Sequence, residues 1–300
     1  MGYVRIIAAA VLWGSIGIAG RAAFHYGVTP LEVAFFRAGI AFLIAAGFVL
    51  ATNPRLLRVR AADLVLFASF GLVSVAVFFF VYLYAISQTS VATAAILLYT
   101  APVFVIALSA LMFGEAFTRG KTAAVAIAFA GCVLVARGYD PLSLRLNLPG
   151  VLAGLASGFT YAMYSIFGKT ALRRYPPVTT LTYALGFGTV ILGLVAIPIG
   201  AVRLSHGPAA WGSIIYLALV ITLAAAWLYL AGLQRVEAGR ASLVATIEPV
   251  IAAILGYVVL GERLEGWQIL GGALVLSAAV LAVQPSRTSE ARTSTAASRP

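Results

Sequence analysis

YTAPVFVIALSALMFGE (residues 99–115) and TIEPVIAAILGYVVLGE (residues 246–262) are two copies of one apolar segment. Each copy has a proline at its fourth position, Pro102 in the first and Pro249 in the second, and each ends in Gly-Glu. The offset between the copies is 147 residues throughout, close to half of the 300-residue chain. This repetition predicts that the two halves of the chain share one architecture.

The composition is that of a protein that lies in a membrane. Hydrophobic residues make up 62% of the chain and charged residues only 10%, whereas soluble domains carry about 25% charged residues. Apolar stretches of about 20 residues recur, each long enough to cross a lipid bilayer as a helix, and they lack the alternation of barrel strands. The sequence therefore predicts an all-α polytopic membrane protein. We expect ten transmembrane helices, over residues 4–25, 31–51, 63–86, 91–113, 121–138, 149–170, 178–200, 211–233, 240–260 and 266–284.

The positive charge of the chain follows this topology. The net charge of +11 would suggest nucleic-acid binding in a soluble protein, but we expect no nucleic-acid partner here. Of the 20 Lys and Arg residues, 14 fall on the side that holds both chain ends, five fall on the opposite side, and Arg37 lies within a span. Because cytoplasmic loops carry the excess of Lys and Arg, we expect both termini in the cytoplasm, with the protein in a bacterial inner membrane.

The ten expected spans divide into two sets of five. Residues 1–147 form the first set and residues 148–284 the second, followed by a polar tail over residues 285–300 that we expect to be disordered. Because five is odd, the second set enters the membrane from the opposite side, which is the inverted-topology repeat typical of secondary transporters. Pro102 and Pro249 then lie beside a central cavity, and either a static kink or a hinge at these prolines fits the sequence.

Several short motifs resemble those of a known transporter family. They are Pro-x(11)-Gly-Glu in both halves, Glu-Pro-Val at residues 248–250, Leu-Trp-Gly at 12–14 and FFRAGIAF at 35–42. Over residues 4–284 the chain resembles the EamA family of the drug/metabolite transporter superfamily, and within it is most similar to amino-acid exporters of the YddG type. The resemblance implies a basket-like bundle in which the first, third, fourth, sixth, eighth and ninth spans surround a cavity. It also implies that the fifth and tenth spans are peripheral.

Aromatic residues on the cavity-lining spans form the expected substrate site. Phe78 and Tyr82 share a face of the third span, and Tyr161 and Tyr164 share a face of the sixth. A concave apolar site with a few hydroxyl groups suits a neutral amino acid, whose ammonium group can rest on an aromatic ring. Each ring taken alone also fits helix packing or an interfacial belt. The full set of expected substrate contacts is Trp13, Phe78, Tyr82, Tyr99, Tyr161, Tyr164, Trp227, Tyr229 and Thr246.

Two charged residues, Glu248 and Arg37, lie deep within the expected spans, where ionisable groups are functional candidates. Glu248 could exchange protons with the substrate, or it could satisfy backbone donors beside Pro249. Arg37 could extend to the nearer interface, pair with Glu32, or hold a substrate carboxylate. The sequence leaves these alternatives open for both residues.

Other functions fit the sequence less well than the export of small neutral metabolites. A nucleotide-sugar or sugar-phosphate exchanger would need several cations converging at mid-membrane, and the spans hold few. An intramembrane enzyme is disfavoured because the chain has only two histidines, His25 and His206, and one cysteine, with no zinc-binding spacing. We therefore expect no enzymatic activity, no metal and no cofactor, in a protein that is a monomer or a homodimer.

Overall fold

A computed structural model of the chain describes residues 1–89, 91–116, 118–142, 147–261 and 264–283. The expected disordered tail over residues 285–300 lies outside the described residues. All regular elements of the described part are helical, which confirms the all-α prediction. They are α1 (Gly2–Trp13), α2 (Ile16–His25), α3 (Pro30–Thr52), the 3-10 turns η1 (Pro54–Leu57) and η2 (Ala61–Asp63), α4 (Leu64–Phe70), the π-helical segment η3 (Gly71–Val77), α5 (Phe78–Gln88), α6 (Val91–Leu98), α7 (Ala101–Phe113), α8 (Arg119–Val135), α9 (Leu148–Ala171), α10 (Pro177–Ala196), α11 (Pro208–Tyr216), the π-helical segment η4 (Leu217–Ala224), α12 (Ala225–Leu233), α13 (Ala238–Ala245), α14 (Glu248–Leu260) and α15 (Gly266–Val283).

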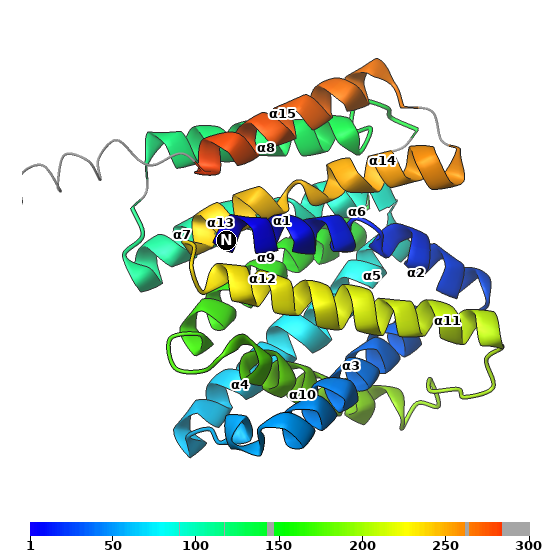
Figure 1. Cartoon of the computed structure of the whole chain (residues 1–300). Coiled ribbons are helices and arrows are strands. Elements are labelled where there is room, and N and C mark those ends of the chain that lie inside the picture. Colours follow the sequence, from blue (N-terminus) through cyan, green and yellow to red (C-terminus); the bar gives the residue numbers. More distant parts are fainter. Residues whose placement is uncertain (90, 117, 143–146, 262–263, 284–300) are drawn as a thin grey trace, which may run out of the picture.

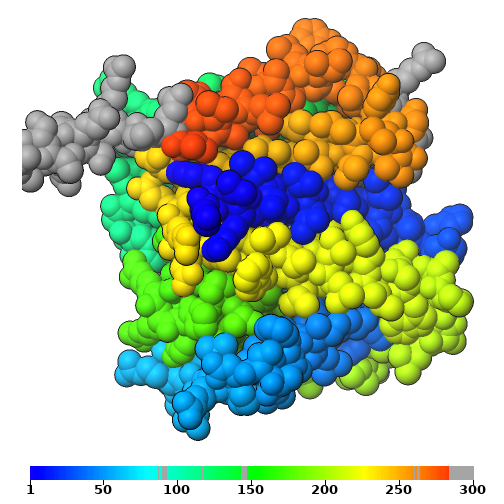
Figure 2. Space-filling view, viewed as in Figure 1, coloured from blue at the N-terminus to red at the C-terminus, as the bar shows by residue number. Residues whose placement is uncertain are grey.

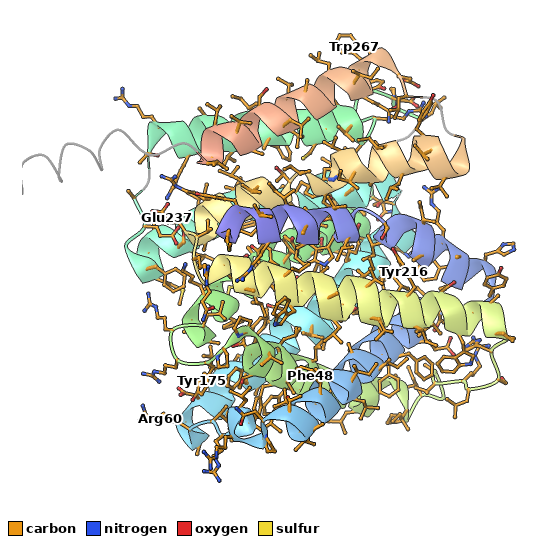
Figure 3. The ribbon with its side chains drawn as sticks, viewed as in Figure 1. Phe48, Arg60, Tyr175, Tyr216, Glu237 and Trp267 are labelled. Atoms are coloured by element: carbon orange, nitrogen blue, oxygen red, sulfur yellow. The ribbon has the colours of Figure 1, made fainter. Side chains whose placement is uncertain are left out.

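The helices have the length and surface of a membrane bundle. Nine helical stretches of the described residues are long and apolar enough to cross a bilayer. The fifth expected span corresponds to α8, which has 17 residues and is not among the nine. Large apolar side chains on the outside of the bundle are exposed, among them Leu43 (68%), Phe48 (62%) and Leu111 (83%). Figure 3 shows Phe48 on this outer surface, and Arg60, Tyr175 and Glu237 at one end of the bundle.

The fourth and ninth spans are broken at equivalent places. The first break separates α6 from α7 at Tyr99 and Thr100, and the second separates α13 from α14 at Thr246 and Ile247. Pro102 and Pro249 lie just after these breaks, in the first turns of α7 and α14. A proline is tolerated there because the first amides of a helix have no intrahelical acceptor. The expected proline kink is therefore a short interruption of the α-helical hydrogen bonding just before each proline. Thr100 and Ile247 keep right-handed helical dihedrals there, and i→i−3 hydrogen bonds bridge the interruption.

Other features recur at the same spacing of 147 residues. Pro30 begins α3 and Pro177 begins α10, and the π-helical segments η3 and η4 occupy matching stretches of the third and eighth spans. Gly114 and Gly261 end α7 and α14 with nearly the same left-handed backbone, φ 67° and ψ 23° against φ 67° and ψ 19°. Glycine suits this conformation because it lacks a Cβ. In Figure 1, α7 ends at the left side of the bundle whereas α14 ends at the right side.

The helices α8 and α15 form a pair along one edge of the bundle (Figure 1). They cross closely at Gly131 and Gly271, where a Cβ on either glycine would lie 2.7 Å from the carbonyl oxygen of the other. Small residues permit such an approach between membrane helices. The first span instead packs against α12 on one side and against α13 and α14 on the other, and Figure 2 shows part of it, in dark blue, at the front surface of the bundle.

Candidate substrate cavity

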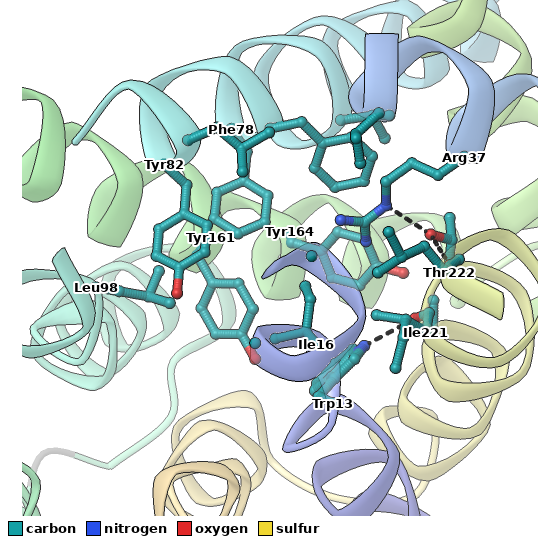
Figure 4. A pocket seen from close by; sticks show the side chains of 18 of the residues that line it. Trp13, Ile16, Arg37, Phe78, Tyr82, Leu98, Tyr161, Tyr164, Ile221 and Thr222 are labelled. Carbon is teal, nitrogen blue, oxygen red and sulfur yellow. Dashed lines mark hydrogen bonds between the residues drawn. The ribbon is translucent and has the colours of Figure 1, made fainter. Parts of the chain in front are cut away.

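A cavity lies between the helices in the half of the bundle that contains α2. Its walls come from the first four spans and from the sixth to ninth spans (Figure 4). The second and seventh spans contribute Val33, Arg37, Leu181 and Leu185. Among the described residues, the cavity is therefore lined by two more spans than the six that the family resemblance implies. No residue of α8 or α15 is among the described residues that line the cavity.

Four of the expected aromatic residues form a continuous wall of the cavity. Phe78 is stacked with Tyr82, with ring centroids 5.9 Å apart, and lies 5.6 Å from Tyr161. Trp13 meets the edge of Tyr161 at 6.1 Å, and its indole N–H donates a hydrogen bond of 3.1 Å to the carbonyl of Ile221. Offset and edge-to-face contacts of this kind are the favoured geometries of aromatic pairs. The wall therefore presents ring faces and edges in fixed positions to a ligand.

Four other expected contacts do not line the cavity. Tyr229 lies behind the aromatic wall, 5.2 Å from Trp13, and its hydroxyl forms a buried hydrogen bond of 2.7 Å with Ser165. The Thr246 hydroxyl donates to the backbone within α13. Trp227 is 42% exposed on the outside of the bundle. Its spacing of two residues from Tyr229 places the two rings on different faces of a helix, a signal present in the sequence. Tyr99 is buried just behind the lining.

Arg37 is held inside the cavity by two contacts. Its Nε donates a hydrogen bond of 2.8 Å to the Thr222 hydroxyl, and its guanidinium lies 4.1 Å from the centre of the Phe79 ring. Thr222 in turn donates to the carbonyl of Leu217, at 2.8 Å, within η4. Arg37 is only 8% exposed, so it does not extend to an interface.

The expected pairing of Arg37 with Glu32 is not formed. Glu32 belongs to the capping box at the start of α3, where it accepts a hydrogen bond from the Thr29 amide. Its carboxylate also binds Arg203 and His206, each at 3.1 Å. Glu32 therefore joins the start of α3 to the loop that carries Arg203 and His206. It is not a partner of Arg37, which lies in the cavity lining.

Glu248 lines the cavity as the first residue of α14. The start of α14 places the partial positive charge of a helix N-terminus beside its carboxylate. The cavity thus combines one acidic side chain, Glu248, and two basic ones, Arg37 and Arg21, with the aromatic wall.

Several features of the lining were not anticipated from the sequence. Ser74 and Tyr164 carry buried hydroxyl groups that have no hydrogen-bond partner among the described residues, and of these only Tyr164 was expected in the site. Gly17 and Gly20 leave open space where a side chain would extend into the cavity. Thr222 is apparent only once η4 and α3 are packed together. Within the described residues, no group of three or more potential ligands could hold a metal ion.

The opposite end of the bundle, at the left of Figure 3, is closed by charged contacts. Glu115 accepts hydrogen bonds from the amides of Ala238 and Gly239, at 2.7 and 3.1 Å, and so caps α13. Lys121 forms an ion pair of 3.0 Å with Glu237 and lies 4.0 Å from Glu115. Burial raises the pKa of Glu237, but the hydrogen bond and charge of Lys121 and the charge of a neighbouring arginine outweigh it and hold this pKa below its usual 4.5.

Comparison with known proteins gives consistent matches along the chain. The model of the EamA-like transporter family matches twice, over residues 1–137 and 148–284. The chain is 33% identical to an uncharacterized transporter of Archaeoglobus fulgidus over 281 residues, covering 94% of this chain and 96% of that protein. It is 28% identical to a probable terminal-alkyne amino-acid exporter of Streptantibioticus cattleyicolor, covering 92% and 91%. A crystal structure of 20% sequence identity shares the fold, with a TM-score of 0.78 over 94% of this chain and 96% of that one.

Proposed function

Because this chain belongs to the EamA-like transporter family, we propose that it exports small neutral metabolites, chiefly amino acids including aromatic ones, as a secondary transporter. The observation that carries the proposal is the cavity whose lining combines Glu248, Arg37 and Arg21 with the aromatic wall. Such a site offers an acceptor for an ammonium group, a donor for a carboxylate and ring faces for an apolar side chain. The 28% identity to a probable amino-acid exporter supports this substrate class.

Transport by alternating access follows from a proposed inverted repeat. The second family match begins and ends 147 residues after the first, the fourth and ninth spans break at matching positions, and α7 and α14 end on opposite sides of the bundle. Two related halves that exchange conformations would expose one central site to either side in turn. We assign the present structure to the state in which the end closed by Glu115 faces the cytoplasm, where positively charged loops belong.

Counterflow in proteoliposomes tests the function directly. Purified protein is reconstituted with unlabelled phenylalanine inside, and uptake of labelled phenylalanine is followed with and without a pH gradient. We expect uptake that Tyr82→Ala reduces at least about tenfold, because it removes a wall ring that touches the ligand. The matched aromatic control Trp227→Ala, on the outside of the bundle, should retain wild-type uptake.

The role of Glu248 is read from the same assay. If Glu248 exchanges protons with the substrate, the wild-type response to a pH gradient disappears in Glu248→Gln. A wild type that ignores the gradient is instead a facilitator with a structural Glu248. Absence of counterflow with every amino acid tested, in protein that is folded and reconstituted, would contradict the proposed substrate class.

A further inference from the structure

Arg37 is a buried cation whose hydrogen-bonding capacity is mostly unused. An arginine has five N–H donors in a planar fork, and only Nε is occupied, by Thr222. Within the part of the chain that the structure describes, no acidic side chain lies at ion-pair distance from Arg37. The donors on the two terminal nitrogens therefore have no protein acceptor there, although an unpaired charge in a membrane interior is costly.

The surroundings of Arg37 fix the direction of this fork. Thr222 gives its own proton to the Leu217 carbonyl, so that its oxygen lone pair is turned to Arg37 Nε. The Phe79 ring covers the guanidinium at 4.1 Å. With one edge held and the ring alongside, the terminal nitrogens face the cavity, as Figure 4 shows. A fork held in this way loses little conformational entropy when a ligand binds.

Two further groups indicate that a polar ligand completes the site. The hydroxyls of Ser74 and Tyr164 line the same cavity, are shielded from solvent and lack a partner among the described residues. Ser74 is 1% exposed. Buried polar groups are normally paired, so these hydroxyls, like the fork of Arg37, are available to hydrogen-bond a ligand in the cavity. A carboxylate matches an arginine fork through two parallel hydrogen bonds.

We propose that Arg37 binds the carboxylate of the transported substrate and thereby restricts transport to carboxylic acids with an apolar body. This inference rests on the proposed function, since it names the substrate group that the same cavity recognises. Thr222 is a positioning residue, because it acts on the substrate through Arg37.

Substrate analogues test the proposal in the wild-type protein. Unlabelled phenylalanine, phenylalaninamide and 3-phenylpropanoate compete against counterflow of labelled phenylalanine. The amide lacks the carboxylate but keeps the ring and the ammonium, whereas 3-phenylpropanoate keeps the carboxylate and lacks the ammonium. We expect the amide to compete at least about tenfold more weakly than phenylalanine, as the loss of a charge-assisted hydrogen bond implies. Equal competition by phenylalanine and phenylalaninamide would overturn the proposal.

Variants then show which residue causes the preference for phenylalanine over its amide. Arg37→Met should reduce the discrimination between phenylalanine and its amide to within about twofold, and Arg37→Lys should restore part of it, because a lysine keeps the charge but not the fork. Thr222→Val should lower the discrimination while Thr182→Val, a matched buried threonine on α10 outside the cavity lining, leaves it unchanged. Discrimination that survives in Arg37→Met but is lost in Arg21→Gln, the other arginine on the cavity wall, would assign the carboxylate elsewhere.

The failure of this inference can be told apart from failure of the proposed function. If no amino acid shows counterflow, carboxylate binding at Arg37 can still be tested by the thermal stabilisation of the purified protein with 3-phenylpropanoate and with phenethylamine. Stabilisation by the acid alone, lost in Arg37→Met, supports a carboxylate site. Stabilisation by the amine alone, or by neither, overturns it. If Arg37→Met does not fold, the wild-type analogue series and Thr222→Val decide.

Discussion

Removal of the Glu115 carboxylate should open the closed end of the bundle. Glu115 is 8% exposed and accepts two hydrogen bonds from the first amides of α13, those of Ala238 and Gly239. In the proposed transport cycle this contact forms only while that end is closed. Glu115→Ala therefore destabilises the closed state and leaves the state with that end open unchanged.

The size of the effect follows from these contacts. A hydrogen bond to a charged group contributes about 1.5–3 kcal/mol, and loss of a helix cap costs about 0.5–2 kcal/mol. Water that enters the space left by the carboxylate recovers part of this loss, so we take about 2 kcal/mol for the pair. Since about 1.4 kcal/mol corresponds to a factor of ten in an equilibrium constant, the open-to-closed ratio should rise roughly thirtyfold.

Cysteine labelling measures this ratio. Ser109 is 1% exposed, and its hydroxyl lies close to Gly239 in the closed end, so a cysteine in its place reacts only when that end opens. In a Ser109→Cys, Cys132→Ala background, maleimide labelling proceeds in proportion to the open population. Glu115→Ala should accelerate this labelling by up to about thirtyfold.

Two controls make the outcome decisive. Glu265→Ala removes a carboxylate that is 45% exposed and paired with Arg137, and exposed pairs contribute little, so labelling should change less than about twofold. Native Cys132, which is fully buried, reports unfolding when it is the only cysteine and should stay unlabelled. An unchanged rate in Glu115→Ala with Cys132 still protected would refute the role given to Glu115.

Three further changes test the packing and the cavity. Gly158→Leu should lower the thermal stability of the purified protein, because even a Cβ at this position would lie 2.5 Å from the Thr100 hydroxyl and overpacking costs about 1–3 kcal/mol. The control Gly47→Leu, on the open outer face of α3, should leave the thermal stability unchanged. Gly20→Leu fills free space in the cavity, so competition assays should show affinity falling more for phenylalanine than for alanine. Tyr229→Phe removes a buried hydrogen bond with Ser165 and should cost about 1–3 kcal/mol of stability, while leaving phenylalanine affinity within about twofold, since Tyr229 does not line the cavity.

The sequence predicted the site residues best where helical spacing fixes which face of a helix a side chain occupies. Phe78 with Tyr82, and Tyr161 with Tyr164, recur at helical spacing, and all four line the cavity. Trp227 is expected in the site as an aromatic residue on a cavity-lining span, but a helix that is apolar all round has no polar face from which to infer which side points inward. Tyr229 shows the same limit, because a buried ring beside the site and one in its lining have the same sequence signature.

The sequence by itself determined the membrane setting, the helical class and the repeat. These depend on local properties: a 20-residue apolar stretch must satisfy its backbone as a helix in lipid, and the residues around Pro102 and Pro249 recur in register. Only the tertiary structure decided the partners of the charges. Glu32 lies five residues from Arg37 but binds Arg203 and His206, whereas Arg37 finds Thr222, 185 residues away. Such choices depend on which helices become neighbours, because a buried charge is stabilised by whatever acceptor the packing brings within reach.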